Sequence, residues 1–311
     1  MTNPTTDPTT DLSAPGTARI LDRGYRPYEG PRRGARGAMR SLIRHSVQRV
    51  LGLKRNVWTK VLPFLTIFFA YVPAIVFVGV AVLLKDRFAT EGVDINDVLP
   101  SYGEYYLFIW AAIEVFAAFS APEVLCTDRR TGMIGLYLAS PLRRDTYLMA
   151  KAAAVGFVLS IVTLGPPLFM LIARTIAGVG PDGVGGFVAV AWRVVVAGII
   201  AAVLPLAMTL AIASTTTRRA AASAAFILIS LGSIVVTEAL INAGGSKTLF
   251  VFNLPYLPIE LVARLFGEPA GKIWSSSASV PTSSLVIAYL VFTALCALFV
   301  RTRYQRIRVT R

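Results

Sequence analysis

The chain has 311 residues, 55% of them hydrophobic and 15% charged, whereas a soluble domain usually carries about 25% charged residues. Its net charge of +14 is also typical of nucleic-acid-binding proteins, but the basic residues flank long apolar segments and form no soluble basic domain, which argues against that class. The two cysteines and one histidine show no spacing typical of a disulfide framework or a metal centre, so we expect no metal site.

Residues 1–37 form the first predicted segment, which is basic and which we expect to be disordered and cytoplasmic. Thr and Pro dominate residues 1–18, and this stretch lacks the apolar core of a cleavable signal peptide. The turn-forming prolines and glycines of residues 19–37 argue against a helix there.

Residues 38–60 differ from this segment, because apolar residues recur there at helical spacing between basic ones. The pattern predicts an amphipathic helix that lies on the cytoplasmic face of the membrane, with Trp58 at the level of the lipid headgroups. Arg40, Arg44 and Arg49 flank its apolar stripe.

Six apolar stretches follow, each long enough to cross a hydrocarbon core of about 30 Å as a helix that rises about 1.5 Å per residue. The sequence therefore predicts an all-α polytopic membrane protein with a transmembrane domain over residues 61–300. Pro63 and Pro73 predict a kink in the first span, and Gly165-Pro166-Pro167 predicts a break near the outer end of the third. The predicted spans are residues 61–84, 104–125, 148–172, 194–213, 221–241 and 283–300.

The basic residues favour one side of these spans. Of the 31 Lys and Arg residues, 24 lie in residues 1–60, 126–151, 214–220 and 301–311. The positive-inside rule therefore predicts that both termini, including the basic tail 301–311, and two loops are cytoplasmic. Arg outnumbers Lys 25 to 6 amid abundant Ala, Gly and Val, as in GC-rich bacterial genomes, so we expect the bacterial cytoplasmic (inner) membrane.

The longest outer loop, residues 242–282, contains an apolar stretch at residues 249–266. Counting this stretch as a seventh span would place the arginines of the C-terminal tail on the outer side. Pro255 and Pro258 also argue against a spanning helix. We therefore expect a short re-entrant or interfacial element on the outer side.

No catalytic motif is found, and we expect that the chain is not an enzyme. A phosphate-binding loop of the GxxxxGK[ST] type needs its glycines, Lys and Ser/Thr at fixed spacing. The stretch Gly267 to Lys272 is one residue too short, and the stretch Gly244 to Thr248 lacks the leading glycine.

Glu114 lies near the centre of the second span, where a charged side chain must face protein or water because burial in lipid costs about 2.5–3.5 kcal/mol. At helical spacing it shares a face with Tyr106 and Trp110. These three residues are candidates for a substrate path. The alternative is a hydrogen-bonded carboxylate that serves packing.

The cytoplasmic loop between the second and third spans has a pattern of its own. Residues 128–132 form a charged turn, and residues 133–137 place apolar residues at helical spacing. Ser140-Pro141 ends this short helix, and Arg143 and Arg144 begin the next. A short amphipathic helix of this kind suits docking into a groove on a soluble partner, or it connects two spans along the membrane surface.

This loop resembles the signature region of ATP-binding-cassette (ABC) type-2 transporter permeases. The family usually has Glu where this chain has Asp128, which keeps the charge. The resemblance extends to the six spans, the preceding amphipathic helix and the outer loop, and so covers roughly residues 38–305. The positions that fill the family pattern are Asp128-Arg129, Gly132, Leu136, Ser140-Pro141, Leu148 and Lys151.

The resemblance implies one membrane half of an exporter, paired with a second permease half as a homo- or heterodimer and bound to a separate ABC ATPase that holds ATP and Mg²⁺. Residues 38–58 would be the connecting helix and residues 132–142 the coupling helix. The residues expected to couple to the ATPase are Asp128, Arg129, Arg130, Gly132, Leu136, Ser140, Pro141, Arg143 and Arg144. The alternatives are an ATP-independent carrier or channel, and a membrane anchor for an ATPase that transports nothing.

Overall fold

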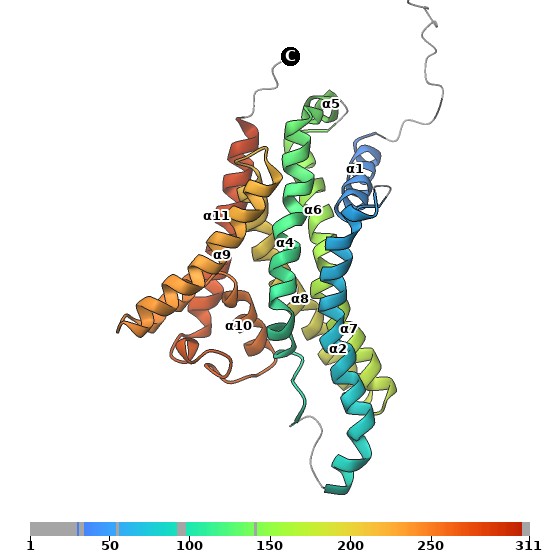
Figure 1. The fold of residues 1–311 in the computed structure, drawn as a ribbon, viewed down its shortest axis with the longest axis vertical. Coiled ribbons are helices and arrows are strands. Elements are labelled where there is room, and N and C mark those ends of the chain that lie inside the picture. The colour runs from blue at the N-terminus through green and yellow to red at the C-terminus, as the bar shows by residue number, and fades with distance from the viewer. Residues whose placement is uncertain (1–29, 31–33, 54–55, 92–97, 140–141, 307–311) are drawn as a thin grey trace, which may run out of the picture. The chain divides into compact units, whose positions relative to one another are not determined.

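The structure is a computed structural model that describes residues 30, 34–53, 56–91, 98–139 and 142–306. The chain divides into two compact units, residues 1–33 and 34–311. Everything below concerns the second unit, whose described residues are mostly helical (Figure 1). Most of the predicted N-terminal segment 1–37, and both residues of the Ser140-Pro141 motif, lie outside the described residues.

Six helices in the described part of the chain are long and apolar enough to cross a membrane, which confirms the prediction of a multi-pass helical membrane protein. Most of the helices extend past the predicted spans at one or both ends. The spans correspond to α2 (Trp58–Glu91), α4 (Tyr105–Arg130), α6 (Arg144–Thr163) continued by α7 (Gly165–Ile176), α8 (Gly183–Ala213), α9 (Arg219–Asn242) and α11 (Thr282–Gln305).

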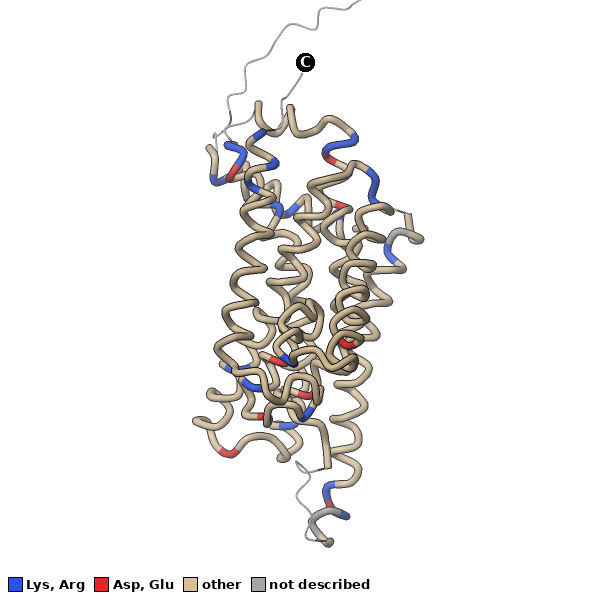
Figure 2. Tube along the Cα trace, turned by 90° about the vertical axis from the view of Figure 1, so that its left-hand side faces the viewer, with Lys and Arg blue, Asp and Glu red and all other residues tan. Residues whose placement is uncertain are grey.

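Charged residues gather at the two ends of this helical unit and are sparse along its middle (Figure 2). One end carries α5 (Met133–Ala139) together with the end of α4, the start of α6 and the end of α11, and we refer to it as the α5 end. The opposite end carries α10 (Tyr256–Leu265), and we refer to it as the α10 end.

The third span is interrupted where the sequence predicts a break. Helix α6 ends at Thr163, and α7 begins with Gly165-Pro166-Pro167, because prolines have no N–H to donate and are tolerated only in the first turn of a helix. A Cβ atom on Gly165 would overlap the hydroxyl of Tyr71 in α2. The glycine therefore lets α2 approach the interruption closely.

Helix α4 is the centre of the unit and packs against α2, α6, α8 and α9 (Figure 1). Small residues permit these close approaches. Ala117 and Ala121 of α4 are fully buried, and a Cβ atom on Gly198 of α8 would overlap the side chain of Leu164. By contrast, α2, α9 and α11 leave most of their apolar surface uncovered, as helices that face lipid do.

The amphipathic helix at the start of the unit differs from the predicted one over residues 38–60. Helix α1 runs from Gly34 to Val50, so it begins in a stretch where the sequence argued against helix and ends ten residues early. Gly52 adopts φ of 67°, and the N–H of Leu53 donates to the carbonyl of Gln48 (2.8 Å), a glycine-dependent way to end a helix.

Helix α1 also packs against the other helices of the protein. It packs along α6, and its buried residues are Leu42, Ser46 and Val50. Trp58 does not belong to this helix, since it is the first residue of α2 and is 82% exposed.

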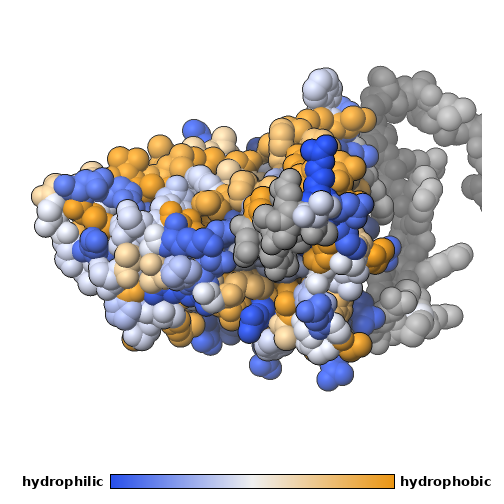
Figure 3. Space-filling view, turned by 90° about the horizontal axis from the view of Figure 1, so that it is seen from below, coloured by the Kyte–Doolittle hydropathy of each residue, from blue (hydrophilic) through white to orange (hydrophobic). Residues whose placement is uncertain are grey.

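The link between α9 and α11 contains three short helices at the α10 end. They are η1 (Lys247–Phe252), α10 (Tyr256–Leu265) and η2 (Ser275–Ser277). Helix α10 has 10 residues, and at about 1.5 Å per residue it is too short to cross a membrane. Seen end-on from below, this end of the molecule presents hydrophilic residues interspersed with apolar ones (Figure 3).

Candidate functional site

The side chain of Asp128 is fully buried in the last turns of α4, at the α5 end. Its carboxylate lies 2.6 Å from Nζ of Lys151 and 2.9 Å from Nη1 of Arg49, and it accepts a hydrogen bond from the hydroxyl of Tyr147 (2.9 Å). Because α1 supplies Arg49 and α6 supplies the other two, Asp128 joins three helices.

Lys151 is as deeply buried as its partner, with 1% of its side chain exposed. Its Nζ also donates to the hydroxyl of Ser46 in α1 (3.0 Å) and lies 5.3 Å and 5.4 Å from the ring centres of Tyr137 and Tyr147. Both rings thus offer cation–π contacts. Burial, followed by the charge of Asp128, raises the pKa of Tyr137 in α5.

A second carboxylate extends the network to α9. Glu123 of α4 forms an ion pair with Arg219, the first residue of α9, and its other oxygen lies 3.6 Å from Nε of Arg49. Arg49 therefore bridges both carboxylates of α4. We refer to Arg49, Glu123, Asp128, Lys151 and Arg219 as the charge network.

Arg129 points away from Asp128 and toward the turn between α8 and α9. Its Nη1 donates to the carbonyl of Ser214 and, at 3.3 Å, to that of Thr216. The charged pair Asp128-Arg129 is thus turned inward on both sides of α4. The pair also belongs to the helix, which continues to Arg130, and not to a turn over residues 128–132 as the sequence suggested.

The other residues expected to couple to an ATPase are placed differently. Gly132 has φ of 68°, and this left-handed turn separates α4 from α5. Leu136 of α5 is 65% exposed, so α5 presents a large apolar side chain at the surface. Arg144 is exposed and donates to the carbonyl of Gln305 at the end of α11. Arg130 and Arg143 are both exposed.

The arginines of the predicted amphipathic helix are also placed differently from one another. Arg49 belongs to the charge network, whereas Arg40 and Arg44 are exposed on α1. The sequence therefore identified a basic helix but not which of its arginines is held inside the protein.

The three residues of the predicted substrate path face three different elements. Tyr106 is fully buried, and its hydroxyl donates to the carbonyl of Thr163 in α6 (3.0 Å). The ring of Trp110 meets the ring of Tyr256 in α10 edge-on at 5.4 Å. Glu114 accepts a hydrogen bond from the hydroxyl of Ser230 in α9 (2.5 Å). Each of these side chains thus meets a different element along the length of α4, and the substrate path stays a prediction.

Sequence reasoning missed several members of the charge network. From the sequence, Lys151 is identified only as a position of the family pattern, and no role is assigned to Glu123, Tyr147 or Arg219. A usable signal was present in α6, where Tyr147 and Lys151 are four residues apart and so share one face. Among the described residues, no three His, Cys, Asp or Glu side chains form a group that could hold a metal ion.

No protein-family model matches the chain, and no curated protein matches it.

Proposed function

We propose that the chain is the membrane permease subunit of an ABC exporter in the bacterial inner membrane. In this proposal, the α5 end faces the cytoplasm, both termini are cytoplasmic, and a separate ATPase subunit binds ATP and Mg²⁺. The proposal rests on the resemblance of the loop around α5 to type-2 permeases. The observation that carries it is an exposed short helix attached to the membrane helices through a buried charge network.

The exposed face of α5 suits a docking contact. Leu136, in the middle of α5, offers an exposed apolar anchor, and Arg130 and Arg143, which precede and follow α5 in the chain, are exposed and positively charged. In this proposal the side chain of Leu136 is covered by a soluble partner when the two proteins bind. A groove on the ATPase subunit would provide that cover.

The charge network would carry movement of α5 to the spans. Tyr137 of α5 contacts Lys151, which is paired with Asp128. Asp128 and Glu123 then connect α4 to α1, α6 and α9. In this proposal, closure of the ATPase pair displaces α5, and these helix ends respond together, so that two permease halves alternate between inward-open and outward-open states.

A specific observation keeps an ATP-independent carrier or channel as the second candidate. Glu114 is a partly exposed carboxylate in the middle of a span, and it is bonded to a hydroxyl of a different span. Such groups mark ion or proton pathways in carriers. An anchor that binds an ATPase but moves no substrate would use the same α5 contact.

Co-purification with the ATPase tests the proposal. We expect the chain to elute with a cognate ATPase subunit as one complex that hydrolyses ATP, and Leu136→Glu to reduce recovery of that complex at least about tenfold, since a buried anchor residue carries about 2 kcal/mol or more. Val184→Glu is the matched control, because Val184 is also exposed but lies at the start of α8, near the α10 end. A complex that tolerates Leu136→Glu as well as Val184→Glu would contradict docking through α5.

Thiol labelling tests the orientation. In a variant without Cys126 and Cys296, we expect a cysteine at Val184 to react with a membrane-impermeant maleimide added to intact cells. A cysteine at Thr217, in the turn between α8 and α9, should react only after the cells are opened. Both positions are exposed in the structure. The opposite labelling pattern would place the α5 end outside.

A further inference from the structure

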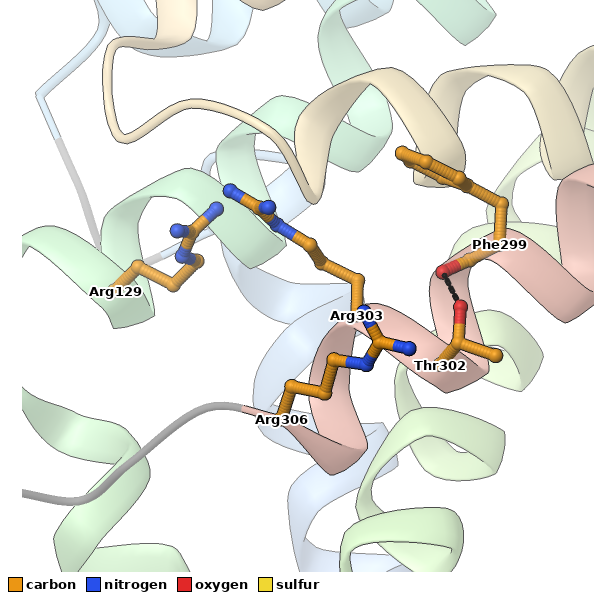
Figure 4. Close-up of a pocket in the computed structure, with 5 residues that line it drawn as sticks. All are labelled: Arg129, Phe299, Thr302, Arg303 and Arg306. Carbon is orange, nitrogen blue, oxygen red and sulfur yellow. Dashed lines mark hydrogen bonds between the residues drawn. The ribbon is translucent and has the colours of Figure 1, made fainter.

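A pocket of about 330 Å³ lies at the α5 end, between the end of α4 and the end of α11 (Figure 4). Three of the five described residues that line it are arginines. The hydroxyl of Thr302 donates to the carbonyl of Phe299 (3.0 Å) and so is already used within α11. The lining residues are Arg129, Phe299, Thr302, Arg303 and Arg306.

The pocket concentrates positive charge, and no acidic side chain among its described lining residues balances that charge. Arg129 and Arg303 point their guanidinium groups toward one another, whereas the guanidinium group of Arg306 lies apart from them and points toward Thr302 (Figure 4). The carboxylates of Glu123 and Asp128 on α4 are already paired within the charge network. Guanidinium groups this close repel each other, and a bound anion would offset that repulsion because it attracts each of them.

The helix dipole explains part of this arrangement. A basic residue in the last turn of a helix, such as Arg303 in α11, is favoured by the partial negative charge of that terminus. This effect does not account for Arg129, which comes from a different helix and is held toward the pocket by the carbonyls of Ser214 and Thr216.

The position of the pocket narrows the choice of anion. Arg303 lies in the last turn of a candidate membrane span that ends at Gln305, so the pocket lies at the level where apolar helix gives way to polar residues. Phe299, one turn before Arg303, provides an apolar wall on the membrane side. Guanidinium groups match phosphate oxygens with two parallel hydrogen bonds, which makes phosphate the best fit.

We propose that this pocket binds a phosphate group, with Arg129 and Arg303 as its ligands and Arg306 as a further positive charge in its lining. The phosphate belongs either to the headgroup of an anionic lipid or to a soluble phosphate compound. This site is independent of the proposed transport function. Because Arg129 also holds the turn between α8 and α9, an occupied pocket fixes that turn relative to α11.

Binding to the purified chain in detergent tests the site, with dioleoylphosphatidylglycerol and inorganic phosphate as separate probes and native mass spectrometry or calorimetry as the readout. We expect Arg303→Gln to weaken binding about tenfold, because one charge-assisted contact is lost. Arg301→Gln is the matched control, since it removes the same charge from the same helix but Arg301 does not line this pocket. Both variants should elute and unfold like the unaltered chain.

The two probes distinguish the sources of the phosphate. Binding of phosphatidylglycerol alone, sensitive to Arg303→Gln, assigns the site to a lipid headgroup. Binding of inorganic phosphate with the same sensitivity assigns it to a soluble compound. The proposal is overturned if neither probe binds, or if Arg303→Gln and Arg301→Gln bind the probes equally well.

Discussion

Replacing Asp128 by Ala is expected to lower the free energy of unfolding by about 3–5 kcal/mol, because it leaves a buried ammonium group without its counter-ion. Lys151 has 1% of its side chain exposed and lies 2.6 Å from the carboxylate that the substitution removes. The hydroxyl of Tyr147 would lose its acceptor as well. Arg49 would still pair with Glu123, so the loss of Asp128 costs less at Arg49 than at Lys151.

Unfolding in detergent, followed by circular dichroism across a denaturant series, measures this effect. Asp145→Ala is the matched control: Asp145 also faces a basic residue, Arg301, but the pair is exposed and 3.5 Å apart, so we expect a loss of about 1 kcal/mol or less. Adding Lys151→Met to Asp128→Ala should restore part of the lost stability, since it removes the unpaired charge. If the double variant were as unstable as the sum of the two single variants, the ion pair would not be the cause.

The second large effect is expected at the α10 end, where Arg264→Met should cost about 3–5 kcal/mol of unfolding free energy. Nε of Arg264 lies 3.0 Å from the carboxylate of Glu260, whose side chain is 2% exposed. The same guanidinium donates to the carbonyls of Ser277 (3.0 Å) and Val280 (2.8 Å). The substitution therefore leaves one buried charge and two carbonyl groups without this donor, and it detaches α10 from the link that precedes α11.

Lys272→Met serves as the control for this prediction. Lys272 also pairs with two carboxylates, those of Glu104 (2.9 Å) and Glu268 (2.6 Å), but 44% of its side chain is exposed. Solvent screens such pairs, so we expect a loss of about 1 kcal/mol or less. The same denaturant series measures the free energy of unfolding of both variants. Equal losses of stability would show that burial does not determine how much the Arg264 contacts stabilise the protein.

The parts of the fold that local sequence determines were predictable. The six spans follow from apolar length alone, and the interruption of the third span follows from Gly165-Pro166-Pro167, whose chemistry acts on its own helix. The end of α1 was missed, because the helical spacing of apolar residues continues past Gly52 and outweighed the one glycine that terminates the helix.

The candidate site was predictable only in part, because its contacts join residues that are far apart in the sequence. Asp128 and Arg129 were singled out from a motif, but their partners Arg49 and Ser214 are 79 and 85 residues away. Periodicity shows which residues share a face of one helix and not which helix that face meets. For the same reason, Tyr106, Trp110 and Glu114 share a face of α4 in the sequence, yet contact α6, α10 and α9 in the structure.

The chain order of the charge network constrains how the protein is made. Arg49 is synthesised 79 residues before Asp128, so an N-terminal partner already exists when the carboxylate of α4 leaves the ribosome. Lys151 arrives with the following span, and Arg219, which pairs with Glu123, arrives 96 residues after that glutamate. During insertion Glu123 can therefore pair with Arg49 as soon as α4 is made, whereas its pair with Arg219 forms only after α9 emerges, so α9 is the last helix to join the charge network.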